Sequence, residues 1–400
     1  MFSYVRTQIH KGVQFCRPWK LLLQNRIYWV VMEARKSEPS QEVQRLFSFG
    51  LIADVQYADV DDRYNFTKTR MRYYRNALNL LREAVSSWKE SREEVNFVVQ
   101  LGDLIDGFNS EKGQAESVAA SRLLFSELEN CAVPVHSVIG NHEFYNFNHK
   151  GLFECGYFSG YELSKRGKDY IKFSAKSQSV SNQHNEVKPN EQSFDEFCRL
   201  LGVPSSGYPS FYHFSPCDGF RVLFLDTYDL SVLGYDTESE VYKESVKILR
   251  SVNKNQQWNS PENLANHEKH FVAFNGGVGQ RQLDWLKKQL TEATEKDEKV
   301  IIFAHCPFYG KVSDTICLVW NHQEVLALIH QFNTVVATFC GHTHLQGYAV
   351  DGHGIHHVVL PGIIETPPGQ NGYATVHVYP DRLDVRGVGL MPSLTLDFKQ

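Results

Sequence analysis

The sequence predicts an α/β fold in which two β-sheets pack face to face and helices cover their outer surfaces. Apolar, strand-like runs alternate with helical periodicity over residues 46–139, which is the first observation behind this prediction. Strands resume at residue 211 after a polar stretch, and short strands separated by glycines follow residue 344. A strand–helix–strand order favours parallel neighbours joined by right-handed crossovers, so we expect mixed sheets.

The first half of the chain alternates regularly between the two kinds of element. Buried strands are expected over residues 46–53, 95–101 and 133–139, because each is a short apolar run. Helices are expected between them at 69–90 and 114–130, where apolar residues recur every three or four positions.

The second half is less regular. Residues 145–210 are rich in polar and aromatic residues and are expected to form an insertion over the site, with one helix near 191–201. Two further helices are expected at 240–250 and 280–294. The remaining strands are expected at 211–214, 220–226, 300–304, 335–340, 346–350, 355–360, 372–379 and 382–388. Residues 45–400 are therefore expected to form one domain.

The composition is typical of a soluble protein, with 42% hydrophobic and 22% charged residues. The net charge of −5 gives no sign of a nucleic-acid-binding surface. No apolar run reaches the roughly 18–20 residues that a membrane-spanning helix needs. Eight cysteines without a C-x-x-C pair favour reduced thiols in a cytoplasmic protein. We expect a monomer that acts on small molecules, without nucleic-acid or membrane partners.

The N-terminal residues 1–44 are expected to be an extension outside the domain. Residues 1–36 hold seven basic residues against one acid, interleaved with apolar residues, which could make an amphipathic organelle-targeting segment. The plainer interpretation is a non-core extension, since Met32 could serve as an alternative start. On either interpretation these residues are not expected to carry the chemistry.

Side chains that bind divalent metals follow five of the apolar runs. In open α/β sheets, ligands bind outside the carboxyl ends of the strands, so these side chains should meet at one rim. A carboxylate can bridge two ions about 3.5–4 Å apart, and residues two apart in an extended segment point the same way. In chain order the residues are Asp54 and Gln56, Asp103 and Asp106, Asn141 and His142, His305, and His342 and His344.

Each of these segments has a structural explanation when it is taken alone. The Gly-Asp and Gly-Asn-His-Glu segments at 102–106 and 140–143 could be ordinary turns, and His305 could be a hydrogen-bonded core histidine. Their combination, each after its own buried strand, indicates a two-metal hydrolytic site instead.

These segments resemble the motifs of the calcineurin-like metallophosphoesterase superfamily: D-x-H, G-D-x-x-D, G-N-H-E/D, a strand-end His and G-H-x-H, in that order. The resemblance covers about residues 46–390 and implies a four-layer αββα sandwich of two mixed β-sheets with two divalent metal ions. It also implies that His142 faces the substrate phosphate and that Asp106 orients His142. By this resemblance the first metal is held by Asp54, Gln56, Asp103 and His344, and the second by Asp103, Asn141, His305 and His342.

Gln56 departs from the superfamily pattern, which usually has a histidine there. An amide oxygen is a harder ligand than imidazole, so the change should favour Mn²⁺, although Mg²⁺ or Zn²⁺ could also bind. The D-x-Q variant resembles one branch, the manganese-dependent ADP-ribose/CDP-alcohol diphosphatases. Asp106 stands where the purple acid phosphatases have a ligating tyrosine, which argues against that branch.

The resemblance implies hydrolysis of a diphosphate bond by metal-activated hydroxide. ADP-ribose would give AMP and ribose 5-phosphate, and CDP-choline would give CMP and phosphocholine. Loop residues that could contact the substrate, or could equally be ordinary packing residues, are Tyr57, Phe66, Arg70, Tyr145, Tyr309 and Cys317.

Two other interpretations remain open. A cyclic-nucleotide phosphodiesterase or a phosphoprotein phosphatase would share nearly every motif, and only Gln56 and the insertion separate them from a diphosphatase. A non-enzymatic, metal-bound scaffold would be supported by loss of a ligand. All seven ligand positions carry competent residues.

Overall fold

The computed structural model describes residues 43–91, 95–157 and 210–399, which belong to one compact unit. The expectations for residues 1–42, and for the part of the insertion at 158–209 with its helix near 191–201, lie outside the described residues.

The first sheet combines parallel and antiparallel strands. Its spatial order is β14 (Leu394–Asp397), β13 (Arg382–Gly387), β12 (Ala374–Val378), β1 (Phe47–Ile52), β4 (Phe97–Gln100) and β5 (Val135–Ser137). The strands β1, β4 and β5 are parallel, as the strand–helix alternation predicts, and the three C-terminal strands continue the sheet antiparallel.

The second sheet is also mixed. Its spatial order is β10 (Gly347–Val350), β11 (His356–Val359), β9 (Val335–Cys340), β8 (Lys299–Phe303), β7 (Phe220–Phe224) and β6 (Tyr212–Cys217). The four inner strands are parallel, and β10 and β6 pair antiparallel at the two edges. The predicted pair of mixed sheets is therefore confirmed.

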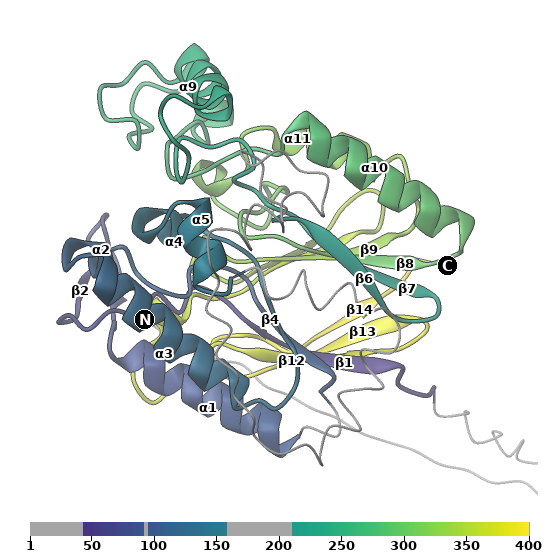
Figure 1. The fold of residues 1–400 in the computed structure, drawn as a ribbon. Helices are drawn as coiled ribbons and strands as arrows, with labels where there is room; N and C mark the ends of the chain where they lie inside the picture. Colours follow the sequence, from purple (N-terminus) through teal and green to yellow (C-terminus); the bar gives the residue numbers. More distant parts are fainter. Residues whose placement is uncertain (1–42, 92–94, 158–209, 400) are drawn as a thin grey trace, which may run out of the picture. The chain divides into compact units, whose positions relative to one another are not determined.

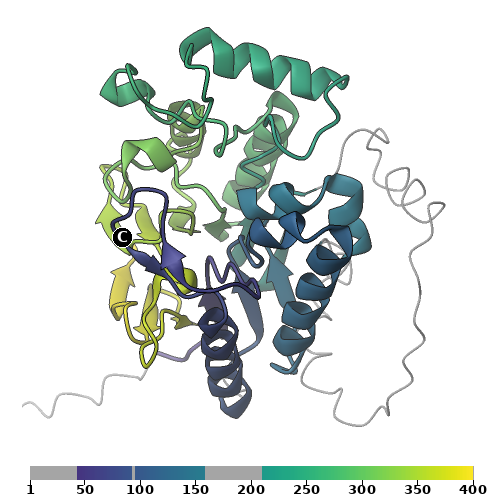
Figure 2. The ribbon, with the colours of Figure 1, turned by 90° about the vertical axis from the view of Figure 1, so that its left-hand side faces the viewer.

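Helices cover the outer faces of both sheets. Figure 1 shows α1 (Asn76–Glu90) and α3 (Gln114–Glu129) outside the first sheet, with α10 (Gln280–Glu295) and α11 (His322–Ile329) outside the second. Figure 2 shows α1 and α3 again side by side, in agreement with the contacts between them. None of the helices in the described ranges has the length and apolarity needed to cross a lipid bilayer.

Shorter elements surround the carboxyl ends of the strands. The other helices within the described ranges are α2 (Phe108–Glu111), α4 (Asn141–Asn146), α5 (His149–Glu154) and α9 (Glu240–Val252), with 3-10 turns at Asn266–Glu268, Thr315–Cys317 and Ile363–Glu365. A hairpin of two short strands, β2 (Arg63–Tyr64) and β3 (Met71–Arg72), precedes α1. The expected helix at 69–90 is therefore wrong over its first turns, because α1 begins at Asn76.

Aromatic side chains fill the space between the sheets. In β1, Phe47, Phe49 and Leu51 alternate toward this inner core, as a strand period of two requires. The Phe49 ring lies 5.4 Å from Phe303 and 6.0 Å from Phe339, both edge to face across the two sheets. These contacts hold the two sheets together below the rim where the site lies.

The outer face of β1 requires a glycine. A Cβ added at Gly50 would lie 2.6 Å from Cε2 of Trp88, a residue of α1 that is only 1% exposed. Because that distance is shorter than any normal contact, Gly50 allows α1 to pack directly on the strand that leads to Asp54.

Candidate metal centre

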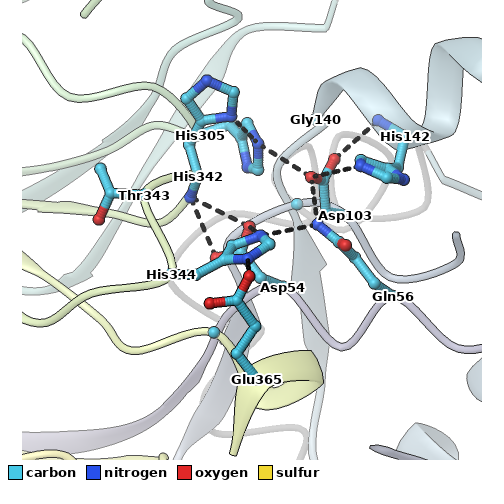
Figure 3. A network of polar contacts seen from close by, with 12 residues as sticks. Asp54, Gln56, Asp103, Gly140, His142, His305, His342, Thr343, His344 and Glu365 are labelled. Carbon is cyan, nitrogen blue, oxygen red and sulfur yellow. Dashed lines mark hydrogen bonds and ion pairs between the residues drawn. The ribbon is translucent and has the colours of Figure 1, made fainter. Parts of the chain in front are cut away.

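The loops after β1, β4, β8 and β9 bring their side chains together at one rim (Figure 3). One group of potential metal ligands consists of Asp103, His305 and His342, and a second consists of Asp54, Asp103 and His344. Within each group the ligand atoms all lie within 4.8 Å of one another. Asp103 belongs to both groups, so a carboxylate shared by two cations is the natural reading of this geometry.

The backbone at this rim is unusual. Five candidate ligands have positive φ angles: Asp54 at 53°, Gln56 at 44°, Asp103 at 56°, His342 at 71° and His344 at 59°. Each such conformation costs a non-glycine residue roughly 1–2 kcal/mol, and such residues cluster at functional sites. The sharp turns are what aim these side chains back across the strand ends.

Hydrogen bonds fix which nitrogen two of the histidines present. His305 Nδ1 lies 2.7 Å from the carbonyl oxygen of Leu101, which can only accept, so Nδ1 carries the proton. His344 Nδ1 donates to Glu365 Oε1 at 2.9 Å. Both rings therefore direct the Nε2 lone pair into the site.

The donor atoms fit divalent cations. His305 Nε2 lies 3.1 Å from His342 Nδ1 and 3.5 Å from Asp103 Oδ2, so the three atoms are close enough to share one cation. Gln56 Nε2 lies 2.9 Å from Asp103 Oδ2 and 2.8 Å from His344 Nε2, while its buried Oε1 has no hydrogen-bond partner. Rotating the amide by a half-turn places Oε1 where Nε2 lies, beside the ligands Asp103 and His344.

The charged side chains of the two ligand groups shift one another's pKa values. Burial would raise the pKa of Asp103, but His305 and His142 outweigh it and hold this pKa well below its usual range. Burial would lower the pKa of His305, but Asp103 raises it to about 9. Burial and the nearby His305 hold the pKa of His342 well below its usual range. The negative charge of Asp103 therefore favours positive charge on the ring of His305 beside it.

Glu143 joins two of the ligand loops. Its carboxylate accepts hydrogen bonds from the backbone N–H groups of Asp103 at 2.8 Å, Leu104 at 2.6 Å and Gly140 at 2.8 Å. Burial, and then repulsion from Asp103, raise the pKa of Glu143 to about 7. Sequence reasoning gave Glu143 no role, although it is the fourth residue of the G-N-H-E segment.

His142 lies beside the shared carboxylate. Its Nδ1 accepts a hydrogen bond from the backbone N–H of Gly107 at 3.1 Å and lies 3.1 Å from Asp106 Oδ2, and its Nε2 is 4.0 Å from Asp103 Oδ2. Burial lowers the pKa of His142, but Asp103 and Asp106 together raise it above its ordinary value. The ring is thus suited to hold a proton next to the candidate metal groups.

Asn141 starts α4 and lies between two tyrosines. Its Oδ1 accepts a hydrogen bond from the Tyr228 hydroxyl at 3.2 Å, and its Nδ2 donates to the Tyr145 hydroxyl at 3.2 Å. No distance places it directly in either ligand group, so its role as a ligand stays a prediction.

Three of the predicted substrate residues lie near this centre. The Tyr145 ring packs edge to face on His142, with the ring centroids 5.0 Å apart. Arg70 forms an ion pair with Glu365, N to O 2.9 Å. Burial, Asp314 and the Asp54 carboxylate raise the pKa of Cys317 to about 12, so its thiol stays protonated.

The other three predicted substrate residues have different surroundings, and their contact with substrate stays a prediction. Tyr57 is half-buried, and its hydroxyl interacts with the charge of Asp59 on the side of α1 and α3. Phe66 is 95% exposed on the turn between β2 and β3. Tyr309 stacks on His357 at 4.5 Å.

Glu365 is a second residue of the site that was not predicted from the sequence. It is 4% exposed and contacts His344 at 2.9 Å, Arg70 at 2.9 Å and Arg72 at 3.4 Å. Arg72 also approaches Asp106, with N to O 4.0 Å. Glu365 ends a 3-10 turn that carries no recognisable motif, so only the fold brings it to the site.

Comparison with known proteins agrees with this geometry. The sequence model of the calcineurin-like phosphoesterase family matches residues 47–201 and 226–346. The manganese-dependent ADP-ribose/CDP-alcohol diphosphatase of Bos taurus is 40% identical over 91% of this chain and 99% of its own. Its Homo sapiens counterpart is 40% identical over 90% of this chain and 95% of its own.

A solved structure shares the fold. The crystal structure of a dimetal phosphatase from Danio rerio superposes with a TM-score of 0.74 and 38% identity, over 89% of this chain and all of that one. The order of the metal-binding segments, the two groups that share Asp103 and these likenesses lead to one conclusion. The chain belongs to the calcineurin-like phosphoesterase family.

Proposed function

We propose that this protein hydrolyses the diphosphate bond of ADP-ribose and of CDP-alcohols such as CDP-choline. The products would be AMP with ribose 5-phosphate, and CMP with phosphocholine. The observation that carries the proposal is the pair of ligand groups sharing Asp103, with Gln56 against one of them. The 40% identity over nine-tenths of the chain to diphosphatases of that name supports the choice of substrate.

The candidate ligands divide between two cations. Asp54, Gln56, Asp103 and His344 would hold one ion, and the other would be held by Asp103, Asn141, His305 and His342. When bound, two divalent ions supply a water of lowered pKa and neutralise charge on the phosphate oxygens. We propose Mn²⁺ as the preferred ion, because Gln56 offers an amide oxygen where a histidine would favour softer metals.

His142 would handle the proton of the leaving group. Its Nε2 lies beside the shared carboxylate and can hydrogen-bond a phosphoryl oxygen or give a proton to the departing phosphate. Asp106 lies 3.1 Å from Nδ1 and stabilises the charged ring. With water as the nucleophile, the proposed reaction needs no nucleophilic serine or cysteine.

Substrate contacts would come from the loops around this centre. Arg70 is held at Glu365 and is partly exposed, so its remaining N–H groups can meet a phosphate. Tyr145 lies against His142 and can line the phosphate site. Phe66, exposed on its hairpin, is available to stack on a base. A monomer acting on small molecules in the cytoplasm completes the proposal.

Steady-state hydrolysis by metal-stripped protein tests the proposal. ADP-ribose, CDP-choline, cyclic AMP and a phosphopeptide would be compared after Mn²⁺ or Mg²⁺ is restored. Release of AMP and CMP, faster with Mn²⁺, is expected. Turnover of cyclic AMP or the phosphopeptide alone would contradict it and assign the protein to phosphodiesterases or phosphoprotein phosphatases.

A further inference from the structure

A buried asparagine outside the metal-binding segments contacts one of the candidate ligands. Asn275 is fully buried, and its Oδ1 lies 2.7 Å from His342 Nε2. Its Nδ2 donates to two backbone carbonyls, of His270 at 2.9 Å and of Ile316 at 2.6 Å. All the polar atoms of this side chain are therefore engaged.

These contacts determine the proton position on the His342 ring. Carbonyl oxygens only accept, so the amide of Asn275 must point its NH₂ group at them and its oxygen at His342. His342 Nε2 must then donate, and it carries the ring proton. The lone pair of the neutral ring is left on Nδ1. This atom lies 3.1 Å from His305 Nε2, within the ligand group that also contains Asp103.

The resulting pattern differs from that of the other two histidines. His305 and His344 are each held through Nδ1 and present Nε2. His342 is held through Nε2 and presents Nδ1. Nδ1 lies closer to the backbone of its own residue than Nε2 does, so the ring of His342 has to be oriented differently from those of His305 and His344. The contact that holds this orientation and selects the tautomer comes from Asn275, outside the His342–His344 segment.

We propose that Asn275 is a positioning residue that holds His342 as the Nε2–H tautomer and so provides the site with an Nδ1 ligand. The inference rests on the metal site of the proposed function and not on its substrate. Through the carbonyl of Ile316, Asn275 also ties His342 to the 3-10 turn Thr315–Cys317. One amide thus links a metal ligand to the loop that carries Cys317.

The ring tautomer can be measured directly in the metal-free protein. Histidine labelled with ¹⁵N distinguishes protonated from unprotonated ring nitrogens, and His342→Gln assigns the His342 signals by their loss. We expect Nε2 of His342 to be protonated and Nδ1 to be unprotonated in the wild type. A His342 ring protonated at Nδ1 alone would overturn the proposal, whatever the activity of the enzyme.

Two variants separate the acceptor oxygen from the loop contacts. Asn275→Leu and Asn275→Asp both remove the NH₂ bonds to His270 and Ile316, but only aspartate keeps an acceptor for His342. Mn²⁺ affinity, measured by electron paramagnetic resonance of the free ion, should fall about 10- to 100-fold in Asn275→Leu. Asn275→Asp should bind Mn²⁺ at least about tenfold more tightly than Asn275→Leu and keep the Nε2–H signal.

Asn253 supplies a matched control. It is fully buried, and its Nδ2 donates to the carbonyls of Trp258, Ser260 and Phe271, without touching any candidate ligand. Asn253→Leu should lower thermal stability but leave the His342 tautomer and Mn²⁺ affinity unchanged.

Three outcomes would overturn the proposal. The first is equal loss of Mn²⁺ affinity in Asn275→Leu and Asn275→Asp. The second is a loss in Asn253→Leu as large as in Asn275→Leu. The third is unchanged affinity in a folded Asn275→Leu. If Asn275→Leu fails to fold, the wild-type and Asn275→Asp spectra still decide the question.

Discussion

Replacing Gly140 by alanine is expected to disable the metal centre. A Cβ at this position would lie 2.2 Å from Asp103 Oδ1, 2.7 Å from His305 Cε1 and 2.8 Å from the backbone nitrogen of Asp103. The φ of −109° at Gly140 suits alanine, so the perturbation is a clash and not backbone strain. The clash falls on the carboxylate that both ligand groups share.

The size of the effect follows from the distances. Real Cβ atoms essentially never approach closer than 3.0 Å, so the carboxylate must move by at least 0.8 Å. It cannot move freely, because Oδ1 accepts from the His142 backbone N–H at 2.8 Å and the carboxylate is fully buried among the other ligands. A misplacement of about 1 Å in a catalytic group costs about 100-fold in rate. That loss corresponds to about 2.7 kcal/mol of transition-state stabilisation.

The assay is kcat/KM for ADP-ribose at saturating Mn²⁺, with thermal unfolding of the metal-free protein as the measure of folding. Gly352→Ala is the control, because no heavy atom lies within 4 Å of a Cβ built at Gly352. It should match the wild type in both measurements. A folded Gly140→Ala variant with more than a tenth of wild-type kcat/KM would refute the reasoning.

Three further predictions concern metal choice, packing and pH. Gln56→His should lower the ratio of the rate with Mn²⁺ to the rate with Zn²⁺, and an unchanged ratio would show that Gln56 does not set selectivity. Gly50→Ala, whose Cβ would lie 2.6 Å from Trp88, should lower the free energy of unfolding by about 1–3 kcal/mol, and an unaltered denaturation curve would contradict this. Burial raises the pKa of Asp351, but hydrogen bonds from His357 and its neighbours hold it at about 2, so the stability it contributes above its unfolded pKa is lost as the pH falls from about 4 to 2. Over that range the Tm of the wild type should fall more steeply than that of Asp351→Asn, and parallel curves would count against the assignment.

The strands were predictable because a buried parallel strand is a short apolar run with polar residues at its end. The run at 335–340 coincides with β9, and 46–53 exceeds β1 by one residue at each end. The helix expected at 69–90 shows that local periodicity alone did not predict where α1 begins. Met71 fits helical spacing, yet it lies in β3, and the backbone nitrogen of Tyr73 donates to the carbonyl of Ile364 at 2.7 Å. Long-range contacts of this kind override local periodicity.

The candidate ligands were predictable for the same reason, since each follows its own strand. Their supporting residues were not. Asn275 and Glu365 act on the ligands from segments in which nothing local marks a role, and Glu143 lies in a motif that does not reveal its contacts with the backbone of the neighbouring loop. The support for His305 is a backbone carbonyl, that of Leu101, which any residue could supply. Only the folded chain identifies such partners.

The central claim is that Asp103 joins two cation sites into one hydrolytic centre. The most direct test is Mn²⁺ titration of metal-stripped wild type and Asp103→Ala, with bound ions counted alongside ADP-ribose turnover. The geometry predicts two ions per wild-type chain, and loss of at least one ion with less than a tenth of the activity in the variant. Full activity with one ion, or an Asp103→Ala variant above a tenth of wild-type activity, would contradict the claim.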